Sequence, residues 1–184
     1  PFKINLFIFG LFFGFGFYLS GVSWIVHSLT YDDNFKILIP FGLIFIPLFL
    51  SLFIAIPVLL IGPSLSLNFS SLIIFSGSLA FSDYLRAKLL TGFPWNLWAY
   101  STSWMIEIMQ VLNHIGLYAY NLIVVTLFTL PVIFFFRLSI IKKLLSLFFS
   151  TLFILSLYIY GNYTINKNKK FLSTLDQKHL VKVI

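Results

Sequence analysis

The chain has 184 residues, of which 60% are hydrophobic and only 9% are charged. Soluble domains carry about 25% charged residues, so this composition excludes a water-soluble globule and indicates a surface that faces lipid. The net charge of +7 comes from basic residues at the ends of apolar segments and in the C-terminal tail. These residues form no basic face, so we expect no nucleic-acid partner. The absence of cysteine excludes disulfides and thiolate metal sites within this chain.

Four windows of the sequence contain no charged residue and are long enough to cross a bilayer. A transmembrane helix needs about 20 apolar residues, so three windows each hold one helix, and the second holds two, separated by a turn at 62–68. The predicted fold is all-α, a polytopic transmembrane bundle of about five helices. The predicted spans are 5–29, 37–61, 69–90, 109–136 and 141–161.

The first two spans carry residues that shape helix packing in lipid. Gly10 and Gly14 are four residues apart, a spacing that lets a neighbouring helix approach closely. We therefore predict tight packing along this face. Pro47 and Pro57 lie inside the second span and Pro131 lies late in the fourth, where each removes a backbone hydrogen bond and favours a kink.

Tryptophan and tyrosine gather on one side of the predicted membrane, at the ends of the first, third and fifth spans. An aromatic belt normally marks both interfaces, so a one-sided cluster favours a face that handles lipid head groups and upper acyl chains. Lysine and arginine counts do not settle orientation, because the result depends on whether the tail lysines are included. The cluster comprises Trp24, Tyr31, Trp95, Trp98, Tyr100, Trp104, Tyr158, Tyr160 and Tyr163.

The end of the third span combines charged residues with turn-forming ones. Asp83 and Arg86 are three residues apart and share a helix face, and an ion pair near hydrocarbon costs less than two lone charges. The pair is either functional or an anchor for the helix end, and Arg86 can alternatively offer its guanidinium to a lipid phosphate. Gly92 and Pro94 end the helix, which places the next tryptophans at head-group depth.

The sequence contains no recognisable catalytic constellation. Asp83 and Glu107 are the acids nearest the turn, but no nucleophile, base and orienting group converge around them. His27, His114 and His179 are far apart and lack a metal-binding partner at helical spacing. We therefore expect neither a metal site nor a cofactor in this chain.

The turn after the third span carries a motif that is specific enough to indicate a protein family. The stretch YLRAKLLTGFPWNLWAYS resembles the signature of bacterial apolipoprotein N-acyltransferases, in which an arginine on a membrane helix leads into Thr-Gly-Phe-Pro-Trp. FGFGFYLSGVSWIVHSL and QVLNHIGLYAYNLIVV resemble the family's helices before and after this motif, and HLVKVI resembles the first strand of the domain that follows. The resemblance covers nearly the whole chain.

This resemblance implies an enzyme of the bacterial inner membrane, with about eight helices and a periplasmic nitrilase-like αββα domain. Such enzymes take an acyl chain from a phospholipid, usually phosphatidylethanolamine. They transfer it to the free amino group of the diacylglyceryl-cysteine that begins a lipoprotein. The catalytic Glu, Lys and Cys lie in the nitrilase-like domain, where the Cys forms a thioester with the acyl chain.

We interpret the chain as a fragment of such an enzyme that holds none of its catalytic residues. Residues 1–163 would be the transmembrane domain, and 164–184 a linker and the first strand of a truncated nitrilase-like domain. The resemblance also makes the aromatic side periplasmic. Asp83 stands where the family often has Glu, and Ala99 where Gly is common. The candidate phospholipid-binding residues are Arg86, Gly92, Phe93, Pro94, Trp95, Trp98 and Tyr100.

Two other classes of protein remain compatible with the residues alone. One is a small polytopic transporter or channel subunit, although its charges would be expected near the bilayer midplane rather than at the edges. The other is a structural module that assembles through the glycine face of the first span.

Overall fold

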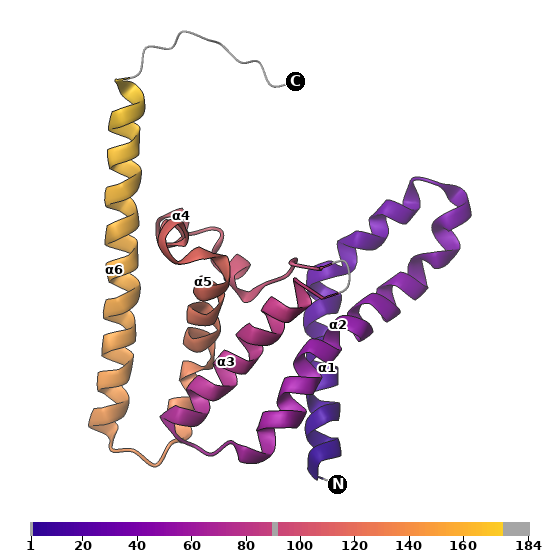
Figure 1. The fold of residues 1–184 in the computed structure, drawn as a ribbon, viewed down its shortest axis with the longest axis horizontal. Coiled ribbons are helices and arrows are strands. Elements are labelled where there is room, and N and C mark those ends of the chain that lie inside the picture. The colour runs from indigo at the N-terminus through magenta and orange to yellow at the C-terminus, as the bar shows by residue number, and fades with distance from the viewer. Residues whose placement is uncertain (1, 90–91, 175–184) are drawn as a thin grey trace.

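The structure, a computed structural model, describes residues 2–89 and 92–174, and these residues form helices and connections without any strand. The predicted strand at the C-terminus lies outside the described residues. In chain order the elements are α1 (Phe2–Val22), the 3-10 helices η1 (Ser23–Thr30) and η2 (Asp33–Leu38), α2 (Ile39–Ile61), η3 (Gly62–Ser64), α3 (Phe69–Arg86), η4 (Trp98–Thr102), α4 (Ile106–Met109), α5 (Leu112–Thr129), η5 (Leu130–Phe135) and α6 (Ile140–Ser173) (Figure 1).

The all-α membrane fold predicted from composition is confirmed. Four helical stretches among the described residues are long and apolar enough to cross a bilayer. They are Phe2–Thr30, Asp33–Ser64, Leu112–Phe135 and Ile140–Ser173. The remaining predicted span corresponds to α3, which has 18 residues, several serines and a charged pair in its last turns. Because these polar side chains lie within its 18 residues, α3 contains no apolar stretch comparable to those of the four long helical stretches.

The bundle has two distinct ends (Figure 1). The N-terminus of α1, the α2–α3 turn and the η5–α6 connection lie at one end. The η1–η2 segment, the α3–α4 connection and the C-terminal end of α6 lie at the other. The connections that carry the tryptophans are thus on one side of the molecule, as the alternation of the spans requires.

The glycines of α1 form the predicted close contact, and their partner is α2. A Cβ atom added to Gly10 would lie 2.8 Å from the Cα of Ala55, and one added to Gly14 would lie 2.9 Å from the Cβ of Ser51. Ala55 and Ser51 are themselves small, four residues apart and fully buried. We call these four residues the α1–α2 seam, and its backbone proximity agrees with small-residue packing in membranes.

The serines of α3 make hydrogen bonds to its two neighbours. The hydroxyl of Ser82 donates to the carbonyl of Phe53 on α2 at 2.5 Å, and the hydroxyls of Ser76 and Thr129 on α5 are 2.8 Å apart. Hydroxyl groups in hydrocarbon need such partners, so they hold α3 between α2 and α5. The apolar core beside them combines Tyr18, Leu50 and further buried side chains of α1, α2, α3 and α5.

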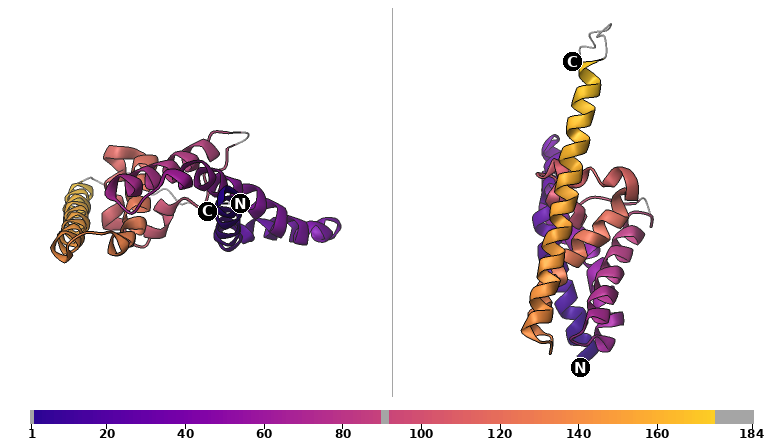
Figure 2. Two further views of the ribbon diagram at one scale, coloured as in Figure 1. Left: turned by 90° about the horizontal axis from the view of Figure 1, so that it is seen from below. Right: turned by 90° about the vertical axis from the view of Figure 1, so that its left-hand side faces the viewer.

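α6 lies at one edge of the bundle and projects beyond it (Figures 1 and 2). It extends to Ser173, twelve residues past the predicted end of the fifth span at 161. Its 34 residues correspond to about 51 Å of helix, against about 30 Å of hydrocarbon. Gly161 is its only buried residue and packs against the backbone of Glu107 in α4.

Candidate functional site

The connection from α3 to η4 is irregular because two of its residues adopt positive φ angles. Gly92 has a φ of 74° and Asn96 a φ of 57°, values that glycine and asparagine tolerate better than other residues. The backbone N–H of Phe93 returns to the carbonyl of Arg86 at 3.0 Å. The chain therefore folds back over the end of α3 instead of leaving it. We call residues 92–97 the site loop.

The guanidinium of Arg86 holds this loop by its backbone. Nη1 donates to the carbonyl oxygens of Phe93 and Trp95, each at 2.7 Å, and Nη2 donates to Oδ1 of Asp83 at 3.0 Å. The arginine side chain is 1% exposed, so the ion pair with Asp83 is buried. The geometry is that of a buried ion pair whose arginine also holds the backbone of the site loop. The Nη donors point to protein groups rather than to an open phosphate site.

A third residue, Asn121 of α5, completes the polar cluster. Its Nδ2 donates to the second carboxylate oxygen of Asp83 at 2.9 Å, and its Oδ1 accepts from the backbone N–H of Ala99 at 2.9 Å. Asn121 is fully buried. We call Asp83, Arg86 and Asn121 the clamp. Sequence spacing predicted the Asp83–Arg86 pair, but Asn121 lies 38 residues from Asp83 and no local pattern indicates it.

Aromatic rings cover the guanidinium. The Cζ of Arg86 lies 5.2 Å from the ring centre of Tyr18 on α1 and 6.0 Å from that of Phe93. Cation–π contacts of this kind stabilise a desolvated guanidinium. Its Nε is buried without a hydrogen-bond partner among the described residues.

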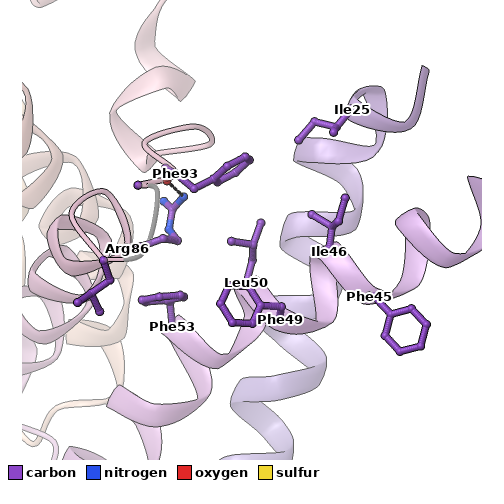
Figure 3. Close-up of a pocket in the computed structure, with 10 residues that line it drawn as sticks. Ile25, Phe45, Ile46, Phe49, Leu50, Phe53, Arg86 and Phe93 are labelled. Carbon is purple, nitrogen blue, oxygen red and sulfur yellow. Dashed lines mark hydrogen bonds between the residues drawn. The ribbon is translucent and has the colours of Figure 1, made fainter. Parts of the chain in front are cut away.

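A cavity of about 430 Å³ opens beside the clamp (Figure 3). Its walls come from α2, η1, the end of α3, Leu89 and the site loop, and Arg86 is the only charged residue among the described residues that line it. A second, entirely apolar hollow of about 380 Å³ shares three of its wall residues and continues along α2 towards Ile56. The shared residues are Phe49, Phe53 and Leu89. Together they form an apolar groove with one polar end.

The predicted site residues divide into two groups. Arg86, Gly92 and Phe93 line the cavity. The others belong to the loop and its aromatic surroundings. Trp95 is 54% exposed and meets Trp24 edge to face, with ring centres 5.8 Å apart, whereas Trp98 stacks on Phe17 at 4.5 Å. The Tyr100 hydroxyl donates to the carbonyl of Pro94 at 3.3 Å. Trp98 thus fills space between helices, whereas Trp95 presents its ring outward.

The two histidines within the described residues lie away from the clamp and the cavity. His114, at the start of α5, is 2.5 Å from the Tyr160 hydroxyl on α6. His27 meets Tyr31 edge to face at 6.0 Å. No three His, Asp or Glu side chains within residues 2–89 and 92–174 gather in a way that could hold a metal ion. The arrangement around the cavity is suited to binding an amphiphile.

Comparisons with a family model and with individual relatives indicate the same protein family. Residues 2–130 match the family model described as "Apolipoprotein N-acyltransferase N-terminal domain". Relatives named apolipoprotein N-acyltransferase include those of Rhodopseudomonas palustris, 36% identical over 129 residues, and Brucella melitensis, 33% identical over 123 residues. These alignments cover 67% and 66% of this chain but 23% of each relative, so the matched region spans about a quarter of the relatives' length. No solved structure matches.

Proposed function

Because the chain belongs to the family of apolipoprotein N-acyltransferase N-terminal domains, we propose that it is the membrane portion of an enzyme that acylates lipoproteins. The acyl donor is a phospholipid, and the acceptor is the N-terminal diacylglyceryl-cysteine of a lipoprotein. The relatives are about four times as long as the matched region, which supports placing the catalytic Glu, Lys and Cys outside these 184 residues.

The observation that carries this proposal is the groove with one polar end. A phospholipid has long apolar chains and a polar glycerol region, and the groove offers an apolar wall along α2 that leads to Arg86. Ligand sites are typically concave and mostly apolar, with a few polar groups that fix orientation. We assign the acyl chain to the apolar walls and the ester region to the clamp end.

Each candidate residue has a role that follows from its position. Among the described residues the Nε of Arg86 has no hydrogen-bond partner, so we assign it to a lipid ester oxygen, which reaches it after a small shift of the cavity wall. Gly92 and Phe93 form part of the cavity wall, and we assign the exposed ring of Trp95 to contact with the glycerol region of the lipid. Pro94, Trp98 and Tyr100 stabilise the loop, through the hydrogen bond from Tyr100 to Pro94 and the stacking of Trp98 on Phe17.

We further propose that the protein is a multi-pass protein of the bacterial inner membrane with its aromatic side in the periplasm. On this proposal residues 1–163 are the transmembrane domain, and 164–184 lead into the first strand of a nitrilase-like domain. α6 runs through Ser173, so residues 164–173 of this proposed linker are helical in the structure.

The family match favours the acyltransferase over the transporter or channel subunit. The geometry agrees, because Asp83 and Arg86, the charged side chains that are buried among the described residues, are bonded to each other and to neighbouring residues. They are not arranged as separate charges along a path. A purely structural module would have no use for the groove beside the clamp.

Replacing Trp95 by Ala in the full-length enzyme tests this proposal. We expect the KM for phosphatidylethanolamine to rise about tenfold with kcat little changed, because a ring that contacts the bound lipid is lost. Trp104→Ala is the matched control, since Trp104 is 77% exposed on the same connection and should leave both constants unchanged. Equal constants for the Trp95 variant and the parent enzyme would make the loop a structural feature only.

A further inference from the structure

We propose that Asp83 and Asn121 are positioning residues, which act through Arg86 and Ala99 to hold the site loop as a wall of the lipid groove. The fixed position of the loop follows from the hydrogen bonds alone. Its effect on lipid binding rests on the proposed function.

The clamp connects three parts of the chain that are distant in sequence. Asp83 and Arg86 belong to α3 and Asn121 belongs to α5. The loop side consists of two backbone carbonyls, bonded by Arg86, and of the Ala99 N–H at the start of η4, bonded by Asn121. Each oxygen of the Asp83 carboxylate has its own donor. The positions of α3, α5 and the loop are therefore mutually fixed.

An anchor for the end of α3 would need only the ion pair. The additional bonds reach seven and nine residues beyond Arg86, and across to α5, which an anchor does not require. Buried charges are costly unless each is paired and hydrogen-bonded, so a network of this kind adopts one arrangement in preference to others. What it specifies here is the path of the irregular segment that lines the cavity.

The network can be rewired without changing its charge. In the double variant D83N/N121D, the amide oxygen at position 83 accepts from Arg86 and the amide nitrogen donates to the carboxylate at 121. That carboxylate still accepts from the Ala99 N–H. Each single variant breaks the pattern: D83N removes the charge that balances Arg86, and N121D places two carboxylates against each other.

The test uses the full-length enzyme in detergent or nanodiscs and compares the parent, D83N, N121D and the double variant. Asn113→Asp is the matched control, because it makes the same chemical change at an exposed position of α5. Two quantities are measured: the KM and kcat for phosphatidylethanolamine, and hydrogen–deuterium exchange of the peptide that contains Ala99. Thermal midpoints identify any variant that fails to fold.

We expect each single variant to raise the KM about tenfold and to speed exchange at Ala99, because D83N leaves Arg86 without its counter-charge and N121D sets two buried carboxylates against each other. The double variant should recover most of both effects, and Asn113→Asp should show neither. A double variant no better than the folded single variants in exchange would overturn the positioning role, as would single variants with parental exchange. If exchange is rescued but none of the proteins transfers an acyl group, the proposed function fails and the clamp's hold on the loop stands.

Discussion

Gly92 determines where the chain turns back over α3. Its φ of 74° lies in the region that side chains with a Cβ avoid, and a Cβ atom there would come 2.7 Å from the carbonyl oxygen of Ala87. Two unfavourable effects, backbone strain and collision, therefore coincide at this position. Gly116 shares the φ of 74° but has open space around it, so it carries the strain alone.

Replacing Gly92 by Ala should lower the free energy of unfolding by more than the same change at Gly116. For the Gly116 variant we expect about 1–3 kcal/mol, because its φ of 74° and ψ of 169° lie in a region that is essentially restricted to glycine. For the Gly92 variant we expect a larger loss because the collision adds to the strain. Gly77, helical and open, is the control and should change by less than about 1 kcal/mol, in the stabilising direction. Thermal unfolding in detergent measures all three. A Gly92 variant as stable as the parent would show that the loop tolerates another path.

The helices differ in how they are held. α1 and α2 approach at the level of the backbone along the α1–α2 seam, whereas α3 is held by hydroxyl hydrogen bonds and by the clamp. α6 meets the others through Gly161, through Ile154 and Leu157, which pack against buried residues of η4, α4 and α5, and through Tyr160. The seam should therefore be the contact most sensitive to added volume.

Gly14→Val should force α1 away from Ser51, because the Cα and Cβ of Ser51 lie within 3.0 Å of the added Cβ position. We expect a loss of about 1–3 kcal/mol, the usual cost of overpacking. Gly16→Val is the matched control on the same helix, since nothing lies within 4 Å of its Cβ position. The measurement is the thermal midpoint in detergent, and equal midpoints for the two variants would contradict the seam.

The positions of the helices were predictable because lipid forces the backbone to satisfy its own hydrogen bonds, so a long charge-free segment has few other solutions. The end of α6 was not. Lys167, Lys169 and Lys170 favour water over hydrocarbon, but lysine is a good helix former and the helix continues through them. Sequence spacing likewise predicted the Asp83–Arg86 pair but not its bond to Asn121, which depends on how α3 packs on α5.

The whole molecule presents two unlike ends. The end with η1, the site loop and α4 carries the tryptophans, and the opposite end carries the α2–α3 turn and the basic connection before α6. Because the charge count leaves orientation open, the periplasmic placement of the aromatic end needs direct measurement.

Single-cysteine labelling measures the orientation, and these 184 residues add no background thiol. Ser103 and Ser139 are exposed serines at opposite ends, so Ser103→Cys and Ser139→Cys form a matched pair. In intact cells a membrane-impermeant maleimide should label position 103, and label position 139 only after the membrane is permeabilised. The reverse pattern would place the tryptophans on the cytoplasmic face and remove the basis for a periplasmic lipid site.

Arg86 bonds to main-chain oxygens of the site loop, and those oxygens are present whatever side chains the loop carries. A substitution at position 95 therefore leaves both hydrogen bonds available, whereas a substitution of Phe93 also removes a ring that covers the guanidinium. The side chain at position 95 can therefore change what the loop presents on its surface while the backbone beneath it keeps its path.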